Sequence, residues 1–165
     1  MCGIGPVEAA AATARAIALD HPDLVLHIGV AGGRRIVPGS IVIGTEAVYC
    51  DLSAQIPVVS SVEPDAALVE LVQRALPEAI GVAIGTSAVV DGPCGVQPNI
   101  RVEGMEGFAV LRACELAGVP AVEIRAISNQ MGEGDRESWQ IRRGLEALAD
   151  VIPRLMDAVA RSRSA

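Results

Sequence analysis

The hydrophobic residues of this chain fall into short, nearly continuous runs that alternate with segments of helical character. The apolar runs lie within residues 23–28, 36–48, 80–90 and 121–127. Because they lack strict polar alternation, they predict strands that are covered on both faces, as in a parallel sheet. The helical segments span residues 7–19, 66–75, 107–118 and 137–160. Their composition, or the helical spacing of their apolar residues, predicts helices.

Alternating strands and helices are typical of an α/β fold, with helices on both faces of a largely parallel sheet. No repeat or linker interrupts the pattern, so residues 1–165 are expected to form a single domain. Local residues mark the helix ends: Pro6 suits a first turn, Asp65 suits a cap, and Gly118 suits a C-terminal cap. Pro153 predicts a kink or a break in the last helix.

Polar side chains flank the helix predicted at 107–118. Glu103 and Glu106 come just before it, and Ser128 and Asn129 follow the next strand. Open α/β sheets bind ligands beyond the carboxyl ends of their strands, so Glu106 and Asn129 are candidates for such a site. Taken singly, each also has a structural explanation. An acidic group suits the N-terminus of a helix, and asparagine commonly forms an Asx turn.

The glycine-rich segment 29–33 is a second candidate, predicted to be a loop after the strand at 23–28. Glycines allow a ligand close to the backbone, although a tight turn explains them equally well. The segment leads into another strand and opens no helix, so it is neither a Rossmann nor a P-loop motif. His21 ends a helix and His27 lies inside a strand, so a surface or core role suits both better than a catalytic triad.

Charge and cysteine content narrow the classes of partner. The formal net charge of −7 argues against nucleic acid and against an anionic membrane surface, since nucleic acids are bound through cationic groups. No apolar run reaches the roughly 18 residues of a membrane-spanning helix. The four cysteines are widely spaced. We therefore expect reduced thiols, no metal site, no disulfide framework and a cytoplasmic location.

Four segments occur in an order and spacing that resemble a known family. They read Gly-Ile-Gly-Pro-Val-Glu-Ala-Ala-Ala from residue 3, His-Ile-Gly-Val-Ala-Gly-Gly from residue 27, Val-Glu-Gly-Met-Glu-Gly from residue 102 and Ile-Arg-Ala-Ile-Ser-Asn from residue 124. Together they resemble the purine nucleoside phosphorylase and nucleosidase superfamily. Within it, the segment 128–141 is most similar to the futalosine hydrolase family, whose members remove hypoxanthine from futalosine in menaquinone biosynthesis.

The resemblance implies a three-layer α/β/α phosphorylase/hydrolase-like fold with a mixed, largely parallel central sheet. Family members carry a strand, a helix and a hairpin ahead of the segment that starts here at residue 3. The glutamate that activates water lies in that early part. We therefore expect a fold that lacks the N-terminal strand and hairpin, and we assign no general base. Oligomerisation is favoured, because sheet edges and apolar helix faces would be exposed.

Asn129 would act on the leaving base. Relatives that cleave adenine nucleosides carry aspartate at this position, where a carboxyl can protonate N7 and accept from the 6-amino group. A 6-oxopurine offers an acceptor at position 6, to which an amide can donate while its carbonyl receives the N7 proton. Asn129 therefore favours hypoxanthine over adenine, since the wrong base would leave a buried polar group unpaired.

The other site residues follow from the same resemblance. Glu106 matches the family carboxylate that binds the ribose 2′- and 3′-hydroxyls, a contact that strengthens as the sugar becomes cationic. Met105 would pack beneath the sugar. The remaining substrate-binding candidates border the base and the ribose, and they are Val30, Ala31, Gly32, Val89 and Val90.

The expected nucleophile is water. Phosphorylases of the superfamily hold phosphate partly through an arginine and a serine or threonine, and His27 and Val30 occupy those positions here. Neither a neutral imidazole nor an isopropyl group is a good anion ligand.

No metal or organic cofactor is implied, and the expected partners are a purine nucleoside and further copies of the chain, as a dimer or larger. Two alternatives stay open: a methylthioadenosine/S-adenosylhomocysteine nucleosidase, and a nucleoside-binding protein with impaired catalysis.

Overall fold

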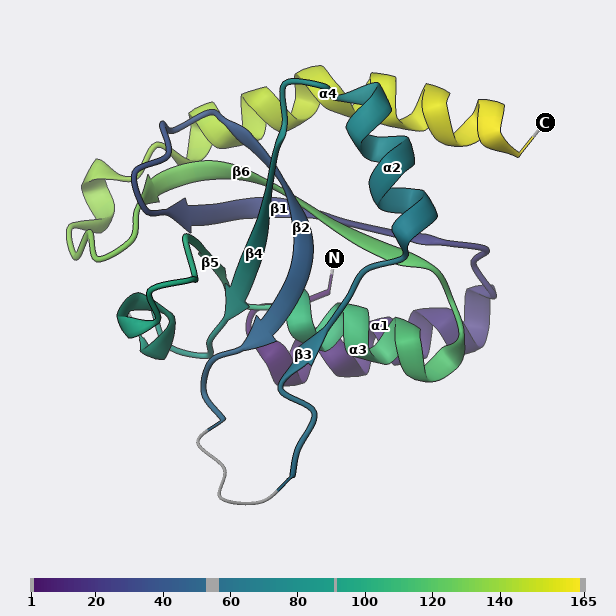
Figure 1. The fold of residues 1–165 in the computed structure, drawn as a ribbon, viewed down its shortest axis with the longest axis horizontal. Coiled ribbons are helices and arrows are strands. Elements are labelled where there is room, and N and C mark those ends of the chain that lie inside the picture. Colours follow the sequence, from purple (N-terminus) through teal and green to yellow (C-terminus); the bar gives the residue numbers. More distant parts are fainter. Residues whose placement is uncertain (1, 53–56, 91, 164–165) are drawn as a thin grey trace.

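The computed structural model describes residues 2–52, 57–90 and 92–163, and it has three layers (Figure 1). The helices are α1 (Pro6–Asp20), α2 (Ala66–Ala75), α3 (Gly107–Ala117) and α4 (Ile141–Ser162). Helices α1 and α3 lie side by side on one face of the sheet, and α2 and α4 cover the other. The predicted three-layer α/β fold is confirmed.

The described residues form a six-stranded mixed sheet with the order β3-β2-β4-β5-β1-β6. Its strands are β1 (Val25–Gly33), β2 (Ile41–Tyr49), β3 (Ser61–Val62), β4 (Ile80–Thr86), β5 (Val102–Gly104) and β6 (Ala121–Gln130). The pairs β1/β6, β2/β4 and β4/β5 are parallel, whereas β1/β5, β2/β3 and β2/β6 are antiparallel. Because β2 pairs with β6 as well as with β4, the sheet curls and closes on itself.

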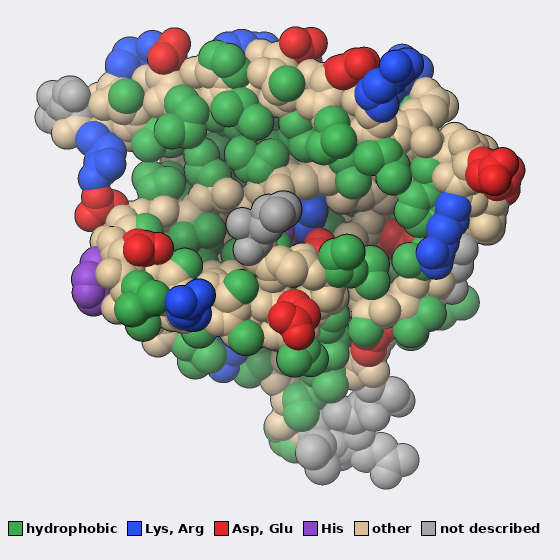
Figure 2. All heavy atoms as spheres, turned by 180° about the vertical axis from the view of Figure 1, so that it is seen from behind, with side chains coloured by type: hydrophobic (Ala, Val, Ile, Leu, Met, Phe, Trp, Pro, Cys, Tyr) green, Lys and Arg blue, Asp and Glu red, His purple; other side chains and the backbone are tan. Residues whose placement is uncertain are grey.

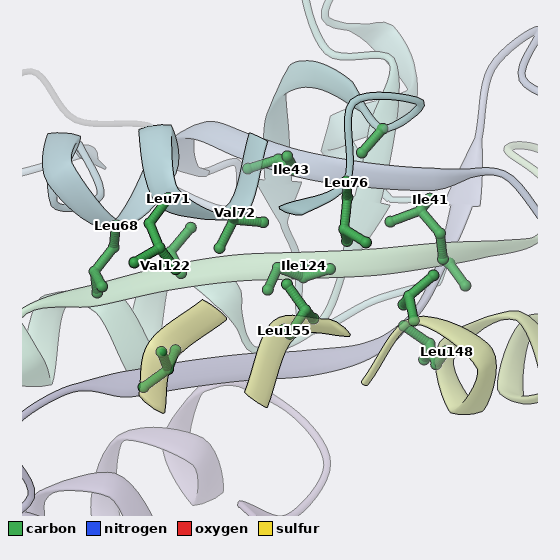
Figure 3. Close-up of a cluster of buried hydrophobic side chains, with 14 residues drawn as sticks. Ile41, Ile43, Leu68, Leu71, Val72, Leu76, Val122, Ile124, Leu148 and Leu155 are labelled. Atoms are coloured by element: carbon green, nitrogen blue, oxygen red, sulfur yellow. The ribbon is translucent and has the colours of Figure 1, made fainter. Parts of the chain in front are cut away.

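The two faces of the sheet are packed differently. Between α2, α4 and the sheet, large aliphatic side chains such as Val72, Ile124 and Leu155 are fully buried (Figure 3). Full burial of one such side chain contributes roughly 1.5–3 kcal/mol to folding. Beneath α1 and α3 the core contains smaller residues, among them Ala9 and Ala109. Small side chains allow these two helices to approach closely.

Local sequence signals account for the ends of the helices. Asp65 caps α2 by accepting a hydrogen bond from the Leu68 amide at 2.9 Å. Gly118 ends α3 in the left-handed conformation, with φ 68°, which glycine adopts without steric cost. The last helix starts at Ile141, after a 3-10 turn, and it continues through Pro153 as one helix. Of the two outcomes predicted for Pro153, a kink or a break, the break is therefore wrong.

The prediction of a loop at 29–33 is also wrong, because these residues are the second half of β1. Their backbone pairs with β6, and Gly32 and Gly33 pair with β5 as well. The register shifts between Ala31 and Gly32, so a bulge bends the strand here. Glycine is needed at position 29 because any Cβ would overlap the guanidinium of Arg125.

Two further strand ends differ from the prediction. β4 ends at Thr86, so residues 87–90 lie beyond the strand. β6 continues to Gln130, so Ser128 and Asn129 lie within the strand, just before its last residue, and do not follow it. The expectation of reduced thiols is corrected at one pair, since Cys50 and Cys94 form a disulfide across 44 residues of sequence. Cys2 and Cys114 are free.

Candidate active site

A cavity of about 260 Å³ opens where β1, β5 and β6 meet the start of α3. All eight residues predicted to form the site line this cavity: Val30, Ala31, Gly32, Val89, Val90, Met105, Glu106 and Asn129. Sequence reasoning did not assign a role to the other lining residues, which are Ile4, Glu103, Gly104, Arg125, Ser128, Trp139 and Ile141. Figure 2 shows that the surface is hollowed between the α4 layer and the α1/α3 layer, with acidic and basic side chains inside.

Glu106 is held at the start of α3 by two hydrogen bonds from distant parts of the chain. The Gly5 amide donates to its Oε1 at 3.1 Å, and the Arg125 Nη2 donates to its Oε2 at 3.4 Å. The side chain is 14% exposed, so a face of the carboxylate stays accessible from the cavity. A fixed, partly buried carboxylate of this kind can accept hydrogen bonds from hydroxyl groups of a ligand.

Arg125 is the main residue that sequence reasoning missed. It lies on β6 with 3% exposure, and its Nε donates to the Glu123 Oε1 at 2.7 Å. Its Nη1 reaches the Val30 carbonyl at 3.5 Å. The available signal was an arginine inside a strand of buried type, since a buried guanidinium requires acidic partners. It thus links Glu106 to a second carboxylate, that of Glu123.

Burial shifts the pKa of two groups beside Arg125, which are His27 and Glu123. Burial and, to a smaller extent, the neighbouring positive charge of Arg125 together lower the pKa of His27 to about 2. The imidazole is therefore neutral, and its 3.8 Å approach to Glu123 is not an ion pair. Burial raises the pKa of the Glu123 carboxyl, and Arg125 opposes that rise. His27 contacts the Arg125 guanidinium at 3.1 Å and does not line the cavity.

Asn129 is 8% exposed at the end of β6, and its amide has a defined orientation. The Ser128 hydroxyl donates to Oδ1 at 2.8 Å, and Nδ2 donates to the Gln130 carbonyl at 3.1 Å. These bonds use one of two Oδ1 lone pairs and one of two N–H groups. One acceptor position and one donor therefore suit a ligand at the cavity. Gly32 leaves room for the amide, because a Cβ there would lie 3.1 Å from Nδ2.

The remaining walls are largely apolar. Val30 and Ala31 come from β1, Met105 lies between β5 and α3, and Trp139 follows the 3-10 turn before α4. The Trp139 indole is fixed by a hydrogen bond from Nε1 to the Glu133 carbonyl at 3.0 Å. Sites that bind small organic molecules commonly combine apolar walls with a few placed polar groups. Within the described residues, no cluster of His, Cys, Asp or Glu has the arrangement of a metal site.

The chain belongs to a known class of protein. A family model described as the phosphorylase superfamily matches residues 1–162, and the chain is therefore a member of that superfamily. No described helix has the length and apolarity needed to cross a membrane.

The most similar proteins include hydrolases and nucleosidases. Futalosine hydrolase of Streptomyces coelicolor is 36% identical, over 93% of this chain and 75% of its own length. The structure of Neisseria meningitidis 5′-methylthioadenosine/S-adenosylhomocysteine nucleosidase with methylthio-immucillin-A is 26% identical. It covers 98% of this chain and 79% of its own, with a TM-score of 0.82. Native futalosine hydrolase of Helicobacter pylori has a TM-score of 0.86 over 94% of this chain and 77% of its own, and at 20% identity the likeness concerns the fold.

Proposed function

We propose that this chain hydrolyses the N-glycosidic bond of a purine nucleoside. We further propose that the nucleoside is futalosine and that hypoxanthine is released, as a step of menaquinone biosynthesis. The observation that carries the proposal is the pairing of Asn129 and Glu106 in one cavity with largely apolar walls. The similarity to the Streptomyces coelicolor futalosine hydrolase supports it.

In the proposed reaction, Asn129 stabilises the departing base. Its Nδ2 donates a hydrogen bond to O6 of the purine. As negative charge builds on the base, N7 takes a proton from solvent water, and the Asn129 Oδ1 accepts a hydrogen bond from the resulting N7–H. Because Ser128 fixes the amide, these groups are in place before the bond between C1′ and N9 breaks. Such preorganised polar groups stabilise charge that develops in the transition state.

Glu106 would bind the ribose from the other side. Its carboxylate accepts hydrogen bonds from the 2′- and 3′-hydroxyls, which become better donors as the sugar takes on positive charge. Arg125 keeps the carboxylate oriented through its bond to Oε2. Met105 packs against the sugar, and water adds to C1′ on the face opposite the base and loses a proton.

The charges of the cavity favour water over phosphate as the nucleophile. Arg125 is the single lysine or arginine among the described lining residues, and it is engaged by Glu106 and Glu123. His27 is neutral, buried and outside the cavity wall. A phosphate dianion would therefore meet carboxylates instead of a cationic binding site.

The alternative substrate class is an adenine nucleoside, as for the nucleosidase from Neisseria meningitidis that the chain resembles. An adenine presents a 6-amino donor, which would face the Nδ2 donor of Asn129. Two donors in contact leave one unpaired, which typically costs about 1–3 kcal/mol. Asn129 therefore favours the 6-oxopurine.

The test is to incubate the protein with futalosine and, separately, with methylthioadenosine or with inosine and phosphate, and to measure the free base. We expect hypoxanthine from futalosine, and we expect Asn129→Asp to lower that rate by about 10²-fold or more. Asn99→Asp is the matched control, because Asn99 is exposed and is the other asparagine of the chain. Adenine release alone would identify a methylthioadenosine-type nucleosidase. Nucleoside binding with no base released would indicate a binding protein.

A further inference from the structure

Residues 87–90, here called the base-side wall, follow β4 and carry Val89 and Val90 into the cavity. The wall lies beyond the end of the strand, and its first residue is still tied to the sheet, because the Ser87 amide donates to the Gly104 carbonyl of β5 at 3.1 Å. Beyond Ser87, the conformation of the wall depends on other contacts. The residue that makes those contacts sets the shape of this side of the cavity.

Asp51 supplies the contacts from just beyond the end of β2. Its Oδ1 accepts a hydrogen bond from the Ser87 hydroxyl at 2.6 Å, and its Oδ2 accepts one from the Ala88 amide at 2.7 Å. The Ser87 Oγ in turn accepts a hydrogen bond from the Val89 amide at 3.1 Å. Hydrogen bonds to a carboxylate are about twice as strong as those between neutral groups. One side chain thus fixes three consecutive residues of the wall.

The surrounding backbone leaves little room for another arrangement. A Cβ at Gly92 would lie 2.7 Å from the Ser87 Oγ and 2.8 Å from the Val89 carbonyl oxygen. The Cys50–Cys94 disulfide joins the residue before Asp51 to the 3-10 turn that follows the wall. The segment after β4 is therefore tied to the end of β2 on both sides.

We propose that Asp51 is a positioning residue for the base-binding side of the cavity. It does not line the cavity, so it acts on the ligand through the base-side wall. The identity of the ligand as a purine rests on the proposed function. Loss of the carboxylate would release the Ala88 amide and the Ser87 hydroxyl, and the backbone beside Val89 would lose its fixed conformation. Base binding would weaken, whereas the ribose contact of Glu106 would remain.

The experiment compares Asp51→Ala, Asp51→Asn and Ser87→Ala with wild type, and Asp150→Asn on the exposed side of α4 is the matched control. Three quantities are measured: hydrogen exchange of residues 87–90, the Kd for hypoxanthine by calorimetry, and KM and kcat for futalosine. We expect Asp51→Ala to raise exchange, Kd and KM each by about tenfold, with kcat changed less. Asp51→Asn keeps one acceptor, so its effect should be intermediate. Asp51→Ala and Ser87→Ala should not be additive.

The outcomes separate this inference from the proposed function. Faster exchange with an unchanged Kd and KM would mean a purely structural role, and it would overturn the proposal, as would exchange equal to that of wild type. If the wild-type chain does not bind hypoxanthine, the proposed function fails. The exchange of residues 87–90 then still decides whether Asp51 holds the wall. Should Asp51→Ala not fold, Asp51→Asn and Ser87→Ala give the same comparison in a less disruptive form.

Discussion

Arg125 is the residue on which the charges around the cavity depend. Its guanidinium is buried and bonds to both Glu106 and Glu123. Removal of one member of such a group leaves the others buried without a partner, which typically costs about 3–5 kcal/mol. His27 is neutral chiefly because it is buried, and the positive charge of Arg125 beside the imidazole lowers its pKa as well. A change at any of these residues should therefore affect Glu106, the proposed ribose ligand.

The neutrality of His27 predicts a loss of stability in mild acid. The pKa of its imidazole is about 2 in the folded protein, against 6.5 for an imidazole side chain in the unfolded chain. Between these values the unfolded chain binds a proton that the folded chain does not, so stability falls as pH falls below about 6.5. From pH 7 to 5.5 this residue alone should lower the free energy of unfolding by about 1 kcal/mol. Urea denaturation at both pH values measures the loss.

Glu123 changes stability with pH in the opposite direction to His27, so a variant is needed to isolate the contribution of His27. Its raised pKa means that the folded state keeps a proton above pH 4.5, and the associated stability is lost as pH rises. Wild type should lose stability between pH 7 and 5.5. We expect His27→Gln to lose much less over the same range. His21→Gln, at an exposed histidine, should leave that difference unchanged. An equal pH dependence in wild type and His27→Gln would mean that His27 does not cause it.

The residues of the cavity differ in how far the sequence could reveal them. Met105, Glu106 and Asn129 lie in contiguous motifs at strand ends, and the structure brings them to one cavity. Their roles remain predictions. Arg125 was missed although Glu123, its partner at 2.7 Å, is only two residues away. Its partners toward the site are distant in sequence: His27 is 98 residues away and Glu106 is 19. Asp51 contacts Ser87 across 36 residues. Neither contact produces a local pattern.

Among the elements, α3 is the one on which the proposed ribose site rests. Its first residue, Gly107, packs directly on the Glu123 carboxylate. Any Cβ at this position would overlap both carboxylate oxygens. The side chain of Glu123 therefore sets how closely the start of α3 approaches β6, and with it the position of Glu106.

Gly107→Ala should destabilise the protein for this reason. Overpacking of a filled core typically costs about 1–3 kcal/mol, and we expect a loss of this size in urea denaturation. Hydrolysis should fall as well, because the start of α3 must shift with Glu106. The matched control is Gly134→Ala, since a Cβ at Gly134 meets no atom within 4 Å, and its effect should lie within about 0.5 kcal/mol. If both variants are equally stable, Glu123 does not lie against α3 as the structure has it.

The elements that the sequence predicted well are those with local signals. Helix α2 was predicted at its observed bounds because Asp65 caps it. Helix α3 was predicted to within one residue because glycines frame it. The glycine-rich half of β1 was taken for a loop, since composition does not reveal pairing with β5 and β6. The three-residue strand β5 is too short for any periodicity. The Cys50–Cys94 disulfide likewise depends on long-range folding.

At the scale of the whole molecule, the α/β class followed from the alternation of elements, whereas the closure of the sheet did not. The β2/β6 pair joins strands with 71 residues between the end of one and the start of the other, from Tyr49 to Ala121. The consequence for function is that the ends of β1, β4, β5 and β6 surround a single cavity. Residues that are remote in sequence thereby form opposite walls of one site.

The outer face of α1 and α3 predicts that copies of the chain associate. A groove of about 840 Å³ on this face is lined largely by apolar residues, and Val7 and Leu116 are 78% and 72% exposed there. Apolar surface of this extent commonly marks a protein interface, and a two-fold dimer is the commonest arrangement. We expect sedimentation at micromolar concentration to give a dimer, and Leu116→Glu to give a monomer because it would bury a charge. Val96→Glu, on the 3-10 turn after β4 and 83% exposed, is the control and should remain dimeric. A wild-type monomer at the same concentration, or a dimer that Leu116→Glu leaves intact, would exclude this face as the interface.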